Sequence, residues 1–402
     1  MLNASEISKD NLHLNRLAPP TRNLCGGVGL IVLLLTCAIA FMQEDGLRRF
    51  YHTYLVSFSF VLSLSLGALF FVLLQHLTHA SWSVVVRRLA EVTAANIPVL
   101  AILFIPILIG MGELYHWTHP EAVAADKLLQ VKKPFLNIPF FLVRCIIYFA
   151  IWWRLASYLL DRSTAQDESG DPQETCRMGK VSTYGMALFA LSLTFFSFDA
   201  LMSLEPHWYS TIFGVYFFAG SMVGFIALIT IFTFLLQRAG RVQKCITIEH
   251  YHDYGKLLFG FIFFWAYIAF SQYMLIWYGN IPEETMWYLA RQEGQWFWVS
   301  MILIFGHFAI PFLALLSRYP KRRKPILFGW AVWMLLMHYV DLYWLVMPHF
   351  SEDTVPLHII DSGCLVGITG IWLYGIIIIA KKRALIPVKD PRLEASLTFE
   401  NA

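Results

Sequence analysis

About ten long apolar runs constrain the fold of this chain more than any other feature. The hydrocarbon core of a bilayer is about 30 Å thick and needs about 20 apolar residues per helix. Because lipid cannot hydrogen-bond the backbone, each run is expected to cross it as an α-helix. Only 14% of the residues are charged, whereas soluble domains carry about 25%. The sequence therefore predicts an all-α integral membrane protein with spans near 24–42, 53–77, 97–116, 137–160, 181–203, 211–236, 257–279, 296–317, 326–347 and 359–380.

The distribution of basic residues predicts the orientation of these helices. Most of the 30 Lys and Arg fall on the side that holds the N-terminus, including the clusters Arg318–Lys324 and Lys381–Arg383. The positive-inside rule places that side in the cytoplasm, where anionic lipid headgroups are expected contacts. We therefore expect residues 1–23 to be a cytoplasmic segment, 24–380 a ten-helix membrane domain, and 381–402 a cytoplasmic tail.

The polar segments between the spans are expected to be loops. Asp161–Lys180 is interpreted as a linker, Arg87 and Arg88 as loop residues, and the chain after Pro387 as a disordered tail. None of these segments is long enough to hold a soluble catalytic domain. The six cysteines form no C-x-x-C or C-x-x-C-H pattern, so no metal site and no covalently bound haem is expected. A net charge of +3 gives no reason to expect nucleic acid as a partner.

Helix parity bears on the architecture. Helices two and six enter the membrane from the same side, so helices 2–5 and helices 6–9 would form two four-helix bundles of parallel orientation. Any internal duplication would then be a parallel repeat, unlike the inverted repeats of many transporters.

Ionisable residues within or beside the apolar runs form a first candidate group. Such residues usually face the bundle interior or water, because exposing them to lipid costs roughly 2.5–3.5 kcal/mol each. Arg144 requires a partner if it is buried, and Asp199 is the first candidate. The remaining members, all in the outer half by the predicted orientation, are Glu113, His116 and Glu205. The group is either a structural ion pair with neighbours or part of a quinone pocket lined by Glu113, His116, Asp199 and Arg144.

A second candidate group lies in the later helices. His338 and Asp341 are three residues apart on one helix face, and His307 is near the middle of the preceding span. Gln272 lies on the helix before that. Imidazole titrates near neutral pH, so histidines aligned with a carboxylate across adjacent helices are typical of a proton relay or a quinol pocket. The alternative for each histidine is a satisfied interhelical hydrogen bond.

Five segments resemble one known family: FFVLLQHLTHASWSVVVRRLAE (70–91), FLNIPFFLVR (135–144), FDALMSLEPHWYSTIFGVYFFAGS (198–221), YGKLLFGFIFFWAYIAFSQYMLIWYGNIPEETMWY (254–288) and LLMHYVDLYWLVMP (335–348). They are similar to the F subunit of bacterial alternative complex III, a quinol:electron-acceptor oxidoreductase, within the NrfD/polysulfide-reductase membrane-anchor family. The resemblance implies two four-helix bundles flanked by two outer helices, in a bacterial inner membrane with both termini cytoplasmic. It also implies three kinds of partner, namely a homologous NrfD-like subunit, an iron–sulfur subunit and haem-c subunits. Proton-moving residues of the family map onto His307, His338, Asp341, Arg144 and Asp199.

Three functions are compatible with these features. The first is a non-catalytic subunit that holds a respiratory complex together and conducts protons, with no redox centre of its own. The second is a subunit that itself binds and oxidises a quinol, menaquinol or ubiquinol, near the outer face. The third is a stand-alone secondary transporter, which predicts broken helices in two inverted halves.

Overall fold

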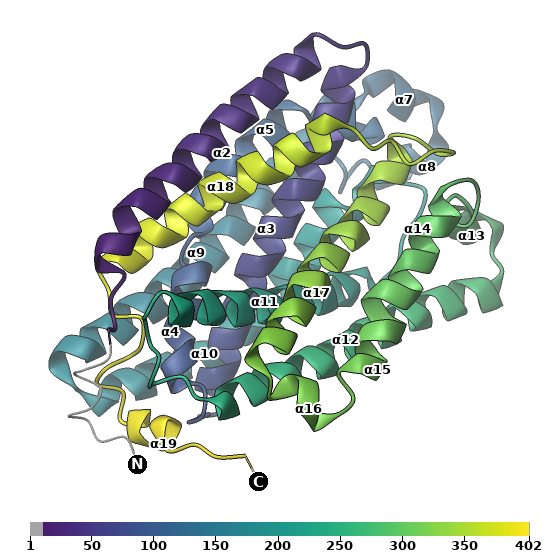
Figure 1. The fold of residues 1–402 in the computed structure, drawn as a ribbon. Coiled ribbons are helices and arrows are strands. Elements are labelled where there is room, and N and C mark those ends of the chain that lie inside the picture. The colour runs from purple at the N-terminus through teal and green to yellow at the C-terminus, as the bar shows by residue number, and fades with distance from the viewer. Residues whose placement is uncertain (1–10, 402) are drawn as a thin grey trace.

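The computed structural model describes residues 11–401, in which ten helical segments are long and apolar enough to cross a membrane. The prediction of an all-α multi-pass membrane protein is confirmed (Figure 1). The spans are α2 (Ala18–Phe41), α3 (Gly46–Leu77), α4 (Val84–Ala94) with α5 (Ile97–Ile109), α9 (Ile138–Ser169), α10 (Pro172–Ala200) with η3 (Met202–Leu204), α11 (Phe213–Arg238), α12 (Ile248–Gly279), α14 (Trp296–Ile302) with η4 (Leu303–Ala309) and α15 (Ile310–Ala314), α17 (Lys324–Val346) with η5 (Met347–His349), and α18 (Ile359–Lys381).

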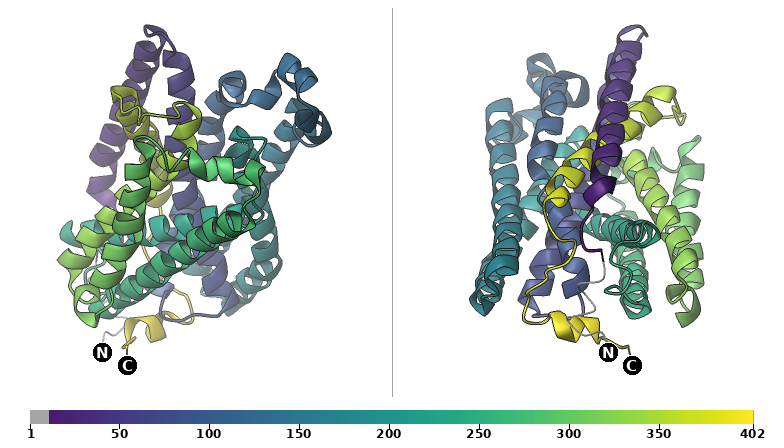
Figure 2. Two further views of the ribbon diagram at one scale, coloured as in Figure 1. Left: turned by 90° about the vertical axis from the view of Figure 1, so that its right-hand side faces the viewer. Right: turned by 60° about the vertical axis from the view of Figure 1, so that its left-hand side comes forward.

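The short helices lie at the two ends of the bundle. One end holds short helices that are part of the connections between spans, namely α6 (Met111–Leu114), η2 (His116–Thr118), α7 (Pro120–Ala125), α8 (Lys127–Lys132) and α13 (Pro282–Leu289). At the other lie η1 (Asn15–Leu17), α16 (Arg318–Lys321) and α19 (Leu393–Leu397). Figures 1 and 2 show that the described part of the chain starts and finishes at this second end. We call it the terminal face, and the other end the opposite face.

The two outer helices, α2 and α18, pack against each other along their length, as Figure 1 shows. Glycines allow this close approach. A Cβ on Gly29 would lie 2.8 Å from the backbone N of Ile371, and one on Gly370 would lie 2.7 Å from the carbonyl O of Cys25. Small residues at helix interfaces are a general means of association in membranes, where lipid is as apolar as leucine.

The remaining helices group around two central ones. Helix α3 contacts α4, α5, α9 and α10, whereas α11 contacts α12 and α17, and α17 in turn contacts α14 and η4. The two groups meet where α3 packs on α11. A Cβ on Gly67 of α3 would lie 2.5 Å from the carbonyl O of Ser221 on α11, so the backbones touch there. Helix α3 is buried almost throughout, and its polar face is therefore isolated from lipid.

The linker expected at Asp161–Lys180 is helical, so that prediction was wrong. Helix α9 continues to Ser169, α10 begins at Pro172, and only two residues separate them. Gly170 ends α9 in the left-handed conformation (φ 69°), and Asp171 caps α10 by accepting a hydrogen bond of 2.9 Å from the Gln173 amide. A glycine after a helix and an aspartate before a proline are ordinary stop and start signals.

Arg87 and Arg88 were also misplaced by the sequence interpretation. They lie on α4, which begins the third span at Val84 and not at residue 97, and both side chains are fully buried. Glu91 bridges them, with 2.9 Å to Nε of each arginine. Asp390 contacts Arg87 at 2.7 Å and Asp167 contacts Arg88 at 2.7 Å. The sequence interpretation took the charged start of α4 for a loop because charged residues usually face water. In the fold, acidic side chains of the same chain pair with these arginines instead.

The chain after Pro387 is ordered through residue 401, contrary to expectation. Asp390 reaches Arg87, and Ser396 on α19 donates a hydrogen bond of 2.7 Å to the carbonyl of Trp82. Near its end, Asn401 donates its side-chain amide to the carbonyl of Glu249. The tail thus contacts α4 of one helix group and α12 of the other at the terminal face.

Candidate functional site

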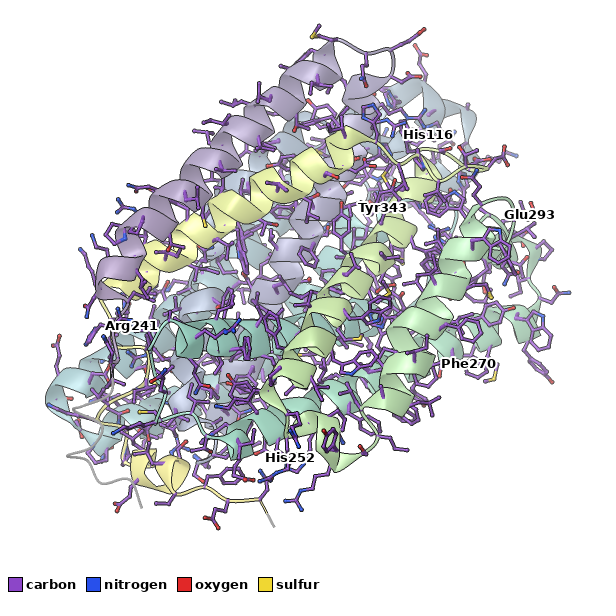
Figure 3. All side chains as sticks on the ribbon, in the orientation of Figure 1. His116, Arg241, His252, Phe270, Glu293 and Tyr343 are labelled. Carbon is purple, nitrogen blue, oxygen red and sulfur yellow. The ribbon has the colours of Figure 1, made fainter. Side chains whose placement is uncertain are left out.

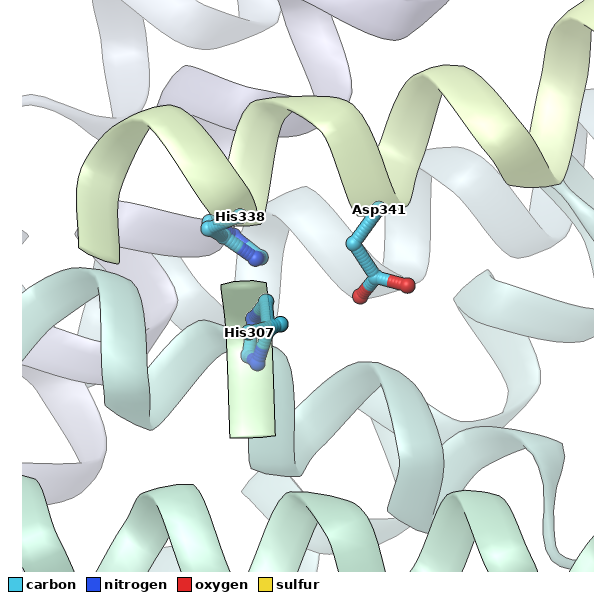
Figure 4. A group of neighbouring side chains, drawn as sticks. All are labelled: His307, His338 and Asp341. Carbon is cyan, nitrogen blue, oxygen red and sulfur yellow. The ribbon is translucent and has the colours of Figure 1, made fainter. Parts of the chain in front are cut away.

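His307, His338 and Asp341 form a buried cluster between α17 and η4. Their candidate ligand or proton-carrying atoms all lie within 4.8 Å of one another. His338 and Asp341 are separated by one turn of α17, and His307 approaches from η4, as Figure 4 shows. None of the three side chains exposes more than 2% of its surface. The second group predicted from the sequence is therefore assembled by the fold.

Asp341 is held by two donors from neighbouring helices. The Tyr216 hydroxyl on α11 donates a short hydrogen bond to Oδ1, and the Trp265 indole on α12 donates one of 3.1 Å to Oδ2. Buried carboxylates require such partners, because an unpaired charge in a low-dielectric interior is strongly disfavoured. Neither Tyr216 nor Trp265 could be singled out in the sequence, since aromatic residues are abundant in every span.

His338 has one nitrogen engaged and one free. The hydroxyl of Ser63 on α3 donates to the carbonyl of Phe60 at 2.7 Å, and Nε2 of His338 lies 2.8 Å from the hydroxyl oxygen of Ser63. Nε2 must then donate to Ser63, which leaves the lone pair on Nδ1. Nδ1 is buried without a hydrogen-bond partner among residues 11–401. A Cβ placed on Gly220 would lie 3.2 Å from Nδ1 and 3.6 Å from Oδ2 of Asp341, so both atoms border the same small space.

His307 is the least satisfied member of the cluster. Both of its ring nitrogens are buried without a partner among the described residues. Its ring lies 3.8 Å from the Trp265 ring, centroid to centroid. The residue stands on η4, a π-helical turn whose Gly306 carbonyl accepts a hydrogen bond of 2.7 Å from the Trp333 indole. Such turns occur frequently at functional sites, and no sequence signature announced this one.

Gln272, expected beside the cluster, is engaged elsewhere. It accepts from Ser210 at 2.9 Å and donates to Tyr288 at 2.9 Å, nearer the opposite face.

Arg144 and Asp199 form the ion pair that the sequence suggested. Nε and Nη2 of Arg144 contact the two carboxylate oxygens at 2.8 and 2.7 Å, which is the bidentate geometry of strong Arg–carboxylate pairs. Tyr148 donates to the same carboxylate at 2.8 Å, and the guanidinium carbon lies 3.9 Å from the centre of the Phe135 ring. The pair is closed on itself, and Asp199 has no exposed surface.

A polar cavity of about 770 Å³ opens at the opposite face. Glu113 and His116 line it, but Arg144 and Asp199 do not, so the four residues expected in one pocket lie in two places. Glu113 and His116 stand on α6 and η2, beyond the end of the third span at Ile109. The other ionisable residues lining the cavity are Arg48, His52, His119, Glu205, His207, Glu283, Arg291, His349 and Glu352.

His207 ties two loops together at the rim of this cavity. Nε2 lies 2.5 Å from Asp126 of the α7–α8 segment, and Nδ1 lies 3.1 Å from Glu205. The hydrogen bond to Asp126, assisted by Glu205, raises the pKa of His207 above its usual value. The same bond lowers the pKa of Asp126. The contact is therefore strongest when His207 is cationic and Asp126 is ionised.

Arg291, on the loop after α13, was not identified from the sequence. It is 1% exposed and donates to the carbonyls of Trp344 and Leu345 at the end of α17, at 3.2 and 2.9 Å. Its guanidinium carbon lies 3.5 Å from the centre of the Trp287 ring. Burial lowers the pKa of Arg291 to about 9. The cation caps a helix C-terminus, where the helix dipole favours positive charge.

Asp361, at the start of α18, was also missed. It accepts a hydrogen bond of 2.8 Å from Thr53 of α3 and one of 3.3 Å from Tyr343 of α17. It also accepts from the His358 amide at 2.9 Å as part of a capping box, and the spacing H-x-x-D before an apolar run could have signalled this.

Between Thr53 and Ser63 on α3, the hydroxyls of Ser57 and Ser59 are buried without partners in the described chain.

No protein-family model matches this chain, and no curated protein is significantly similar to it.

Proposed function

We propose that this chain is the proton-conducting membrane subunit of a respiratory quinol-oxidising complex of the alternative complex III type. Two lines support the proposal. Five of its segments resemble the F subunit of that complex, and the fold brings His307, His338 and Asp341 into one buried cluster. A homologous NrfD-like subunit would oxidise the quinol, while iron–sulfur and haem-c subunits would carry the electrons.

The observation that carries the proposal is the set of free nitrogens in the cluster. A buried polar atom without a partner costs about 1–3 kcal/mol. The free positions on His307 and on Nδ1 of His338 suit atoms that bind a proton transiently, or ordered water that delivers one. Asp341, held by Tyr216 and Trp265, is the acidic member that would stabilise an imidazolium beside it.

An outlet for the proton would run along α3. Ser63 contacts His338, and the buried hydroxyls of Ser57 and Thr53 continue along the same helix toward Asp361. His52, the neighbour of Thr53, lines the polar cavity at the opposite face. In the orientation expected from the basic residues, that face is the outer one. Water or side-chain motion would have to bridge the remaining gaps.

A second candidate function is that the cavity itself receives the quinol headgroup. Its volume of about 770 Å³ falls within the range of small-molecule sites, about 300–1,000 Å³, and Glu113 and His116 could accept protons there. The closed Arg144–Asp199 pair offers no free group to such a ligand. The quinone pocket of this second proposal is therefore limited to the cavity residues.

The decisive experiment is Asp341→Asn in the assembled complex, reconstituted in vesicles. The substitution keeps the size of the side chain and the acceptor for Trp265, but removes the ionisable group. We expect electron transfer to continue with fewer protons released per electron. Glu293→Gln, which changes an exposed carboxylate at the opposite face, is the matched control. A normal proton yield in the Asp341 variant would reject the relay.

A second substitution separates the two candidates. Glu113→Gln should leave the proton yield and quinol oxidation unchanged if the first proposal holds. A selective loss of quinol affinity in this variant would instead support quinol binding in the cavity.

A further inference from the structure

An apolar cavity of about 360 Å³ lies between the outer helix pair and the bundle, close to the terminal face. Its walls come from α2, α4, α11 and α18, and they are almost entirely aliphatic, with Leu89, Val92, Leu235 and Ile376 as examples. Arg88, the one charged side chain among the described lining residues, is already engaged by Glu91 and Asp167. The interior of the cavity therefore suits a hydrocarbon chain.

The cavity borders the part of the surface that faces lipid. Leu235 contributes to its wall and still exposes 49% of its surface, and Leu24, next to the lining residue Cys25, exposes 65%. In a bilayer these side chains contact acyl chains. A lipid could thus enter sideways, between α2 and α11, without any helix unwinding.

The rim of the cavity at the terminal face is basic. Ala380 lines the cavity at the end of α18, and Lys381, Lys382 and Arg383 follow it directly. Ala239 lines it at the end of α11, between Arg238 and Arg241. Among the described residues that line the cavity, none has an acidic side chain. The rim therefore attracts anions at the depth where headgroups begin.

Arg241 supplies an observation independent of the cavity. It exposes only 8% of its surface, yet its Nε and Nη1 have no hydrogen-bond partner among residues 11–401. Arg241 follows the lining residue Ala239 by two positions, and Figure 3 labels it at the level of the terminal ends of α2 and α18. A nearly buried guanidinium with unused donors is costly unless an anion completes it. Nothing in the described chain does so.

We propose that one anionic phospholipid binds here, with an acyl chain in the cavity and its phosphate on Arg241. Lys381, Lys382 and Arg383 surround the headgroup and favour an anionic over a zwitterionic lipid, because each basic side chain near the surface contributes about 1 kcal/mol. The bound lipid fills the gap between the α2–α18 pair and the bundle. This site is separate from the proton-transfer cluster and does not depend on it.

Native mass spectrometry of the purified protein tests the proposal, with phosphatidylglycerol, phosphatidylcholine and a quinone offered as competing ligands. We expect one phosphatidylglycerol to be retained per chain, and Arg241→Gln to lower that retention by about ten-fold, since charge-assisted hydrogen bonds are lost. Arg323→Gln, which removes an exposed basic side chain on the same face, should have little effect. Equal losses in both variants would reduce the effect to a diffuse surface charge and overturn the site.

A variant that fills the cavity tests the acyl-chain part. Ala239 is exposed at the mouth, so Ala239→Phe obstructs the cavity without straining the core or changing the charge. We expect it to abolish retention of phosphatidylglycerol while the thermal unfolding of the protein stays unchanged. Undiminished lipid binding in this variant, or preferential retention of the quinone by the unaltered protein, would overturn the proposal.

Discussion

The indole of Trp265 donates a hydrogen bond of 3.1 Å to Asp341, and the centre of the same ring lies 3.8 Å from the centre of the His307 ring, with the two planes tilted by 31°. One side chain thus couples the carboxylate to an imidazole that has no hydrogen-bond partner of its own in the described chain. An imidazolium at His307 would lie against the face of the indole, a favourable arrangement for a cation. Trp265 is therefore suited to hold the Asp341 carboxylate and the His307 imidazole close enough to each other for proton transfer.

Trp265→Phe separates these two contributions. The substitution keeps an aromatic face for His307 but removes the donor to Asp341, and a hydrogen bond to a charged group contributes about 1.5–3 kcal/mol. We expect proton transfer to slow by at least about ten-fold, measured as vesicle acidification under steady electron transfer. Trp152→Phe removes a buried indole that donates to the Ser192 hydroxyl between α9 and α10, outside the cluster, and serves as the control. Comparable slowing in both variants would contradict a specific role for Trp265.

The Arg144–Asp199 pair is expected to matter for stability more than for turnover. Arg144→Met leaves a buried carboxylate with only Tyr148 as a side-chain donor, and breaking a buried pair in this way costs about 3–5 kcal/mol. The double variant Arg144→Met, Asp199→Leu should recover much of that loss, because no charge then remains buried. Unfolding in denaturing detergent, arranged as a double-mutant cycle, measures the coupling. Additive losses would show that the two residues act separately.

The positions of the ten spans could be predicted because composition alone defines a lipid-compatible helix. The ends of the helices could not. Residues 161–169 are polar, yet α9 continues through them, since a helix can extend past the hydrocarbon core once its neighbours pack against it. Likewise, the sequence predicts loop positions for Arg87 and Arg88, whereas the fold surrounds them with Glu91, Asp167 and Asp390. Two of these three partners are more than seventy residues away, and single-sequence patterns do not connect such positions.

The candidate site was partly predictable for the same physical reason. An ionisable residue within a span usually pairs with another polar group. The sequence could therefore suggest that Arg144 lies near Asp199 and that His338 lies near Asp341. Ser63, Tyr216 and Trp265 carry no charge and are common residue types, so nothing distinguished them from ordinary packing. The π-helical turn that turns His307 toward α17 depends on backbone geometry, which the apolar pattern does not report.

The loop contact at His207 should depend on pH. Because its folded pKa is raised, His207 stabilises the contact fully below its unfolded pKa, about 6.5, and loses this as pH rises through the folded value. Asp126, whose pKa is lowered, loses its contribution as pH falls through its own folded value. The hydrogen-exchange protection factors of the α8 amides, which compare each rate with the intrinsic rate at the same pH, should therefore be highest between these two limits. His207→Gln should remove the alkaline limb, and an unchanged profile in that variant would assign the effect to other groups.

The last prediction concerns the tail. Burial alone would raise the pKa of Asp390, but the Arg87 guanidinium together with Arg392 outweighs this effect and holds the pKa below its usual range. Asp390→Ala leaves Arg87 with Glu91 alone, which Arg88 also uses, and should destabilise the protein by about 3 kcal/mol. Thermal unfolding measures the loss, and limited proteolysis should show cleavage after Pro387 in the variant only.

Glu394→Ala alters an exposed side chain on α19 and is the control for this change. Because a depressed carboxyl pKa contributes stability that disappears on acidification, the unaltered protein should approach the Asp390 variant as pH falls through the folded pKa of Asp390. The difference between the two should be full at neutral pH, where Asp390 is ionised. If the variant were as stable as the unaltered protein at neutral pH, the contact between the tail and α4 would contribute nothing to stability, and the prediction would be wrong.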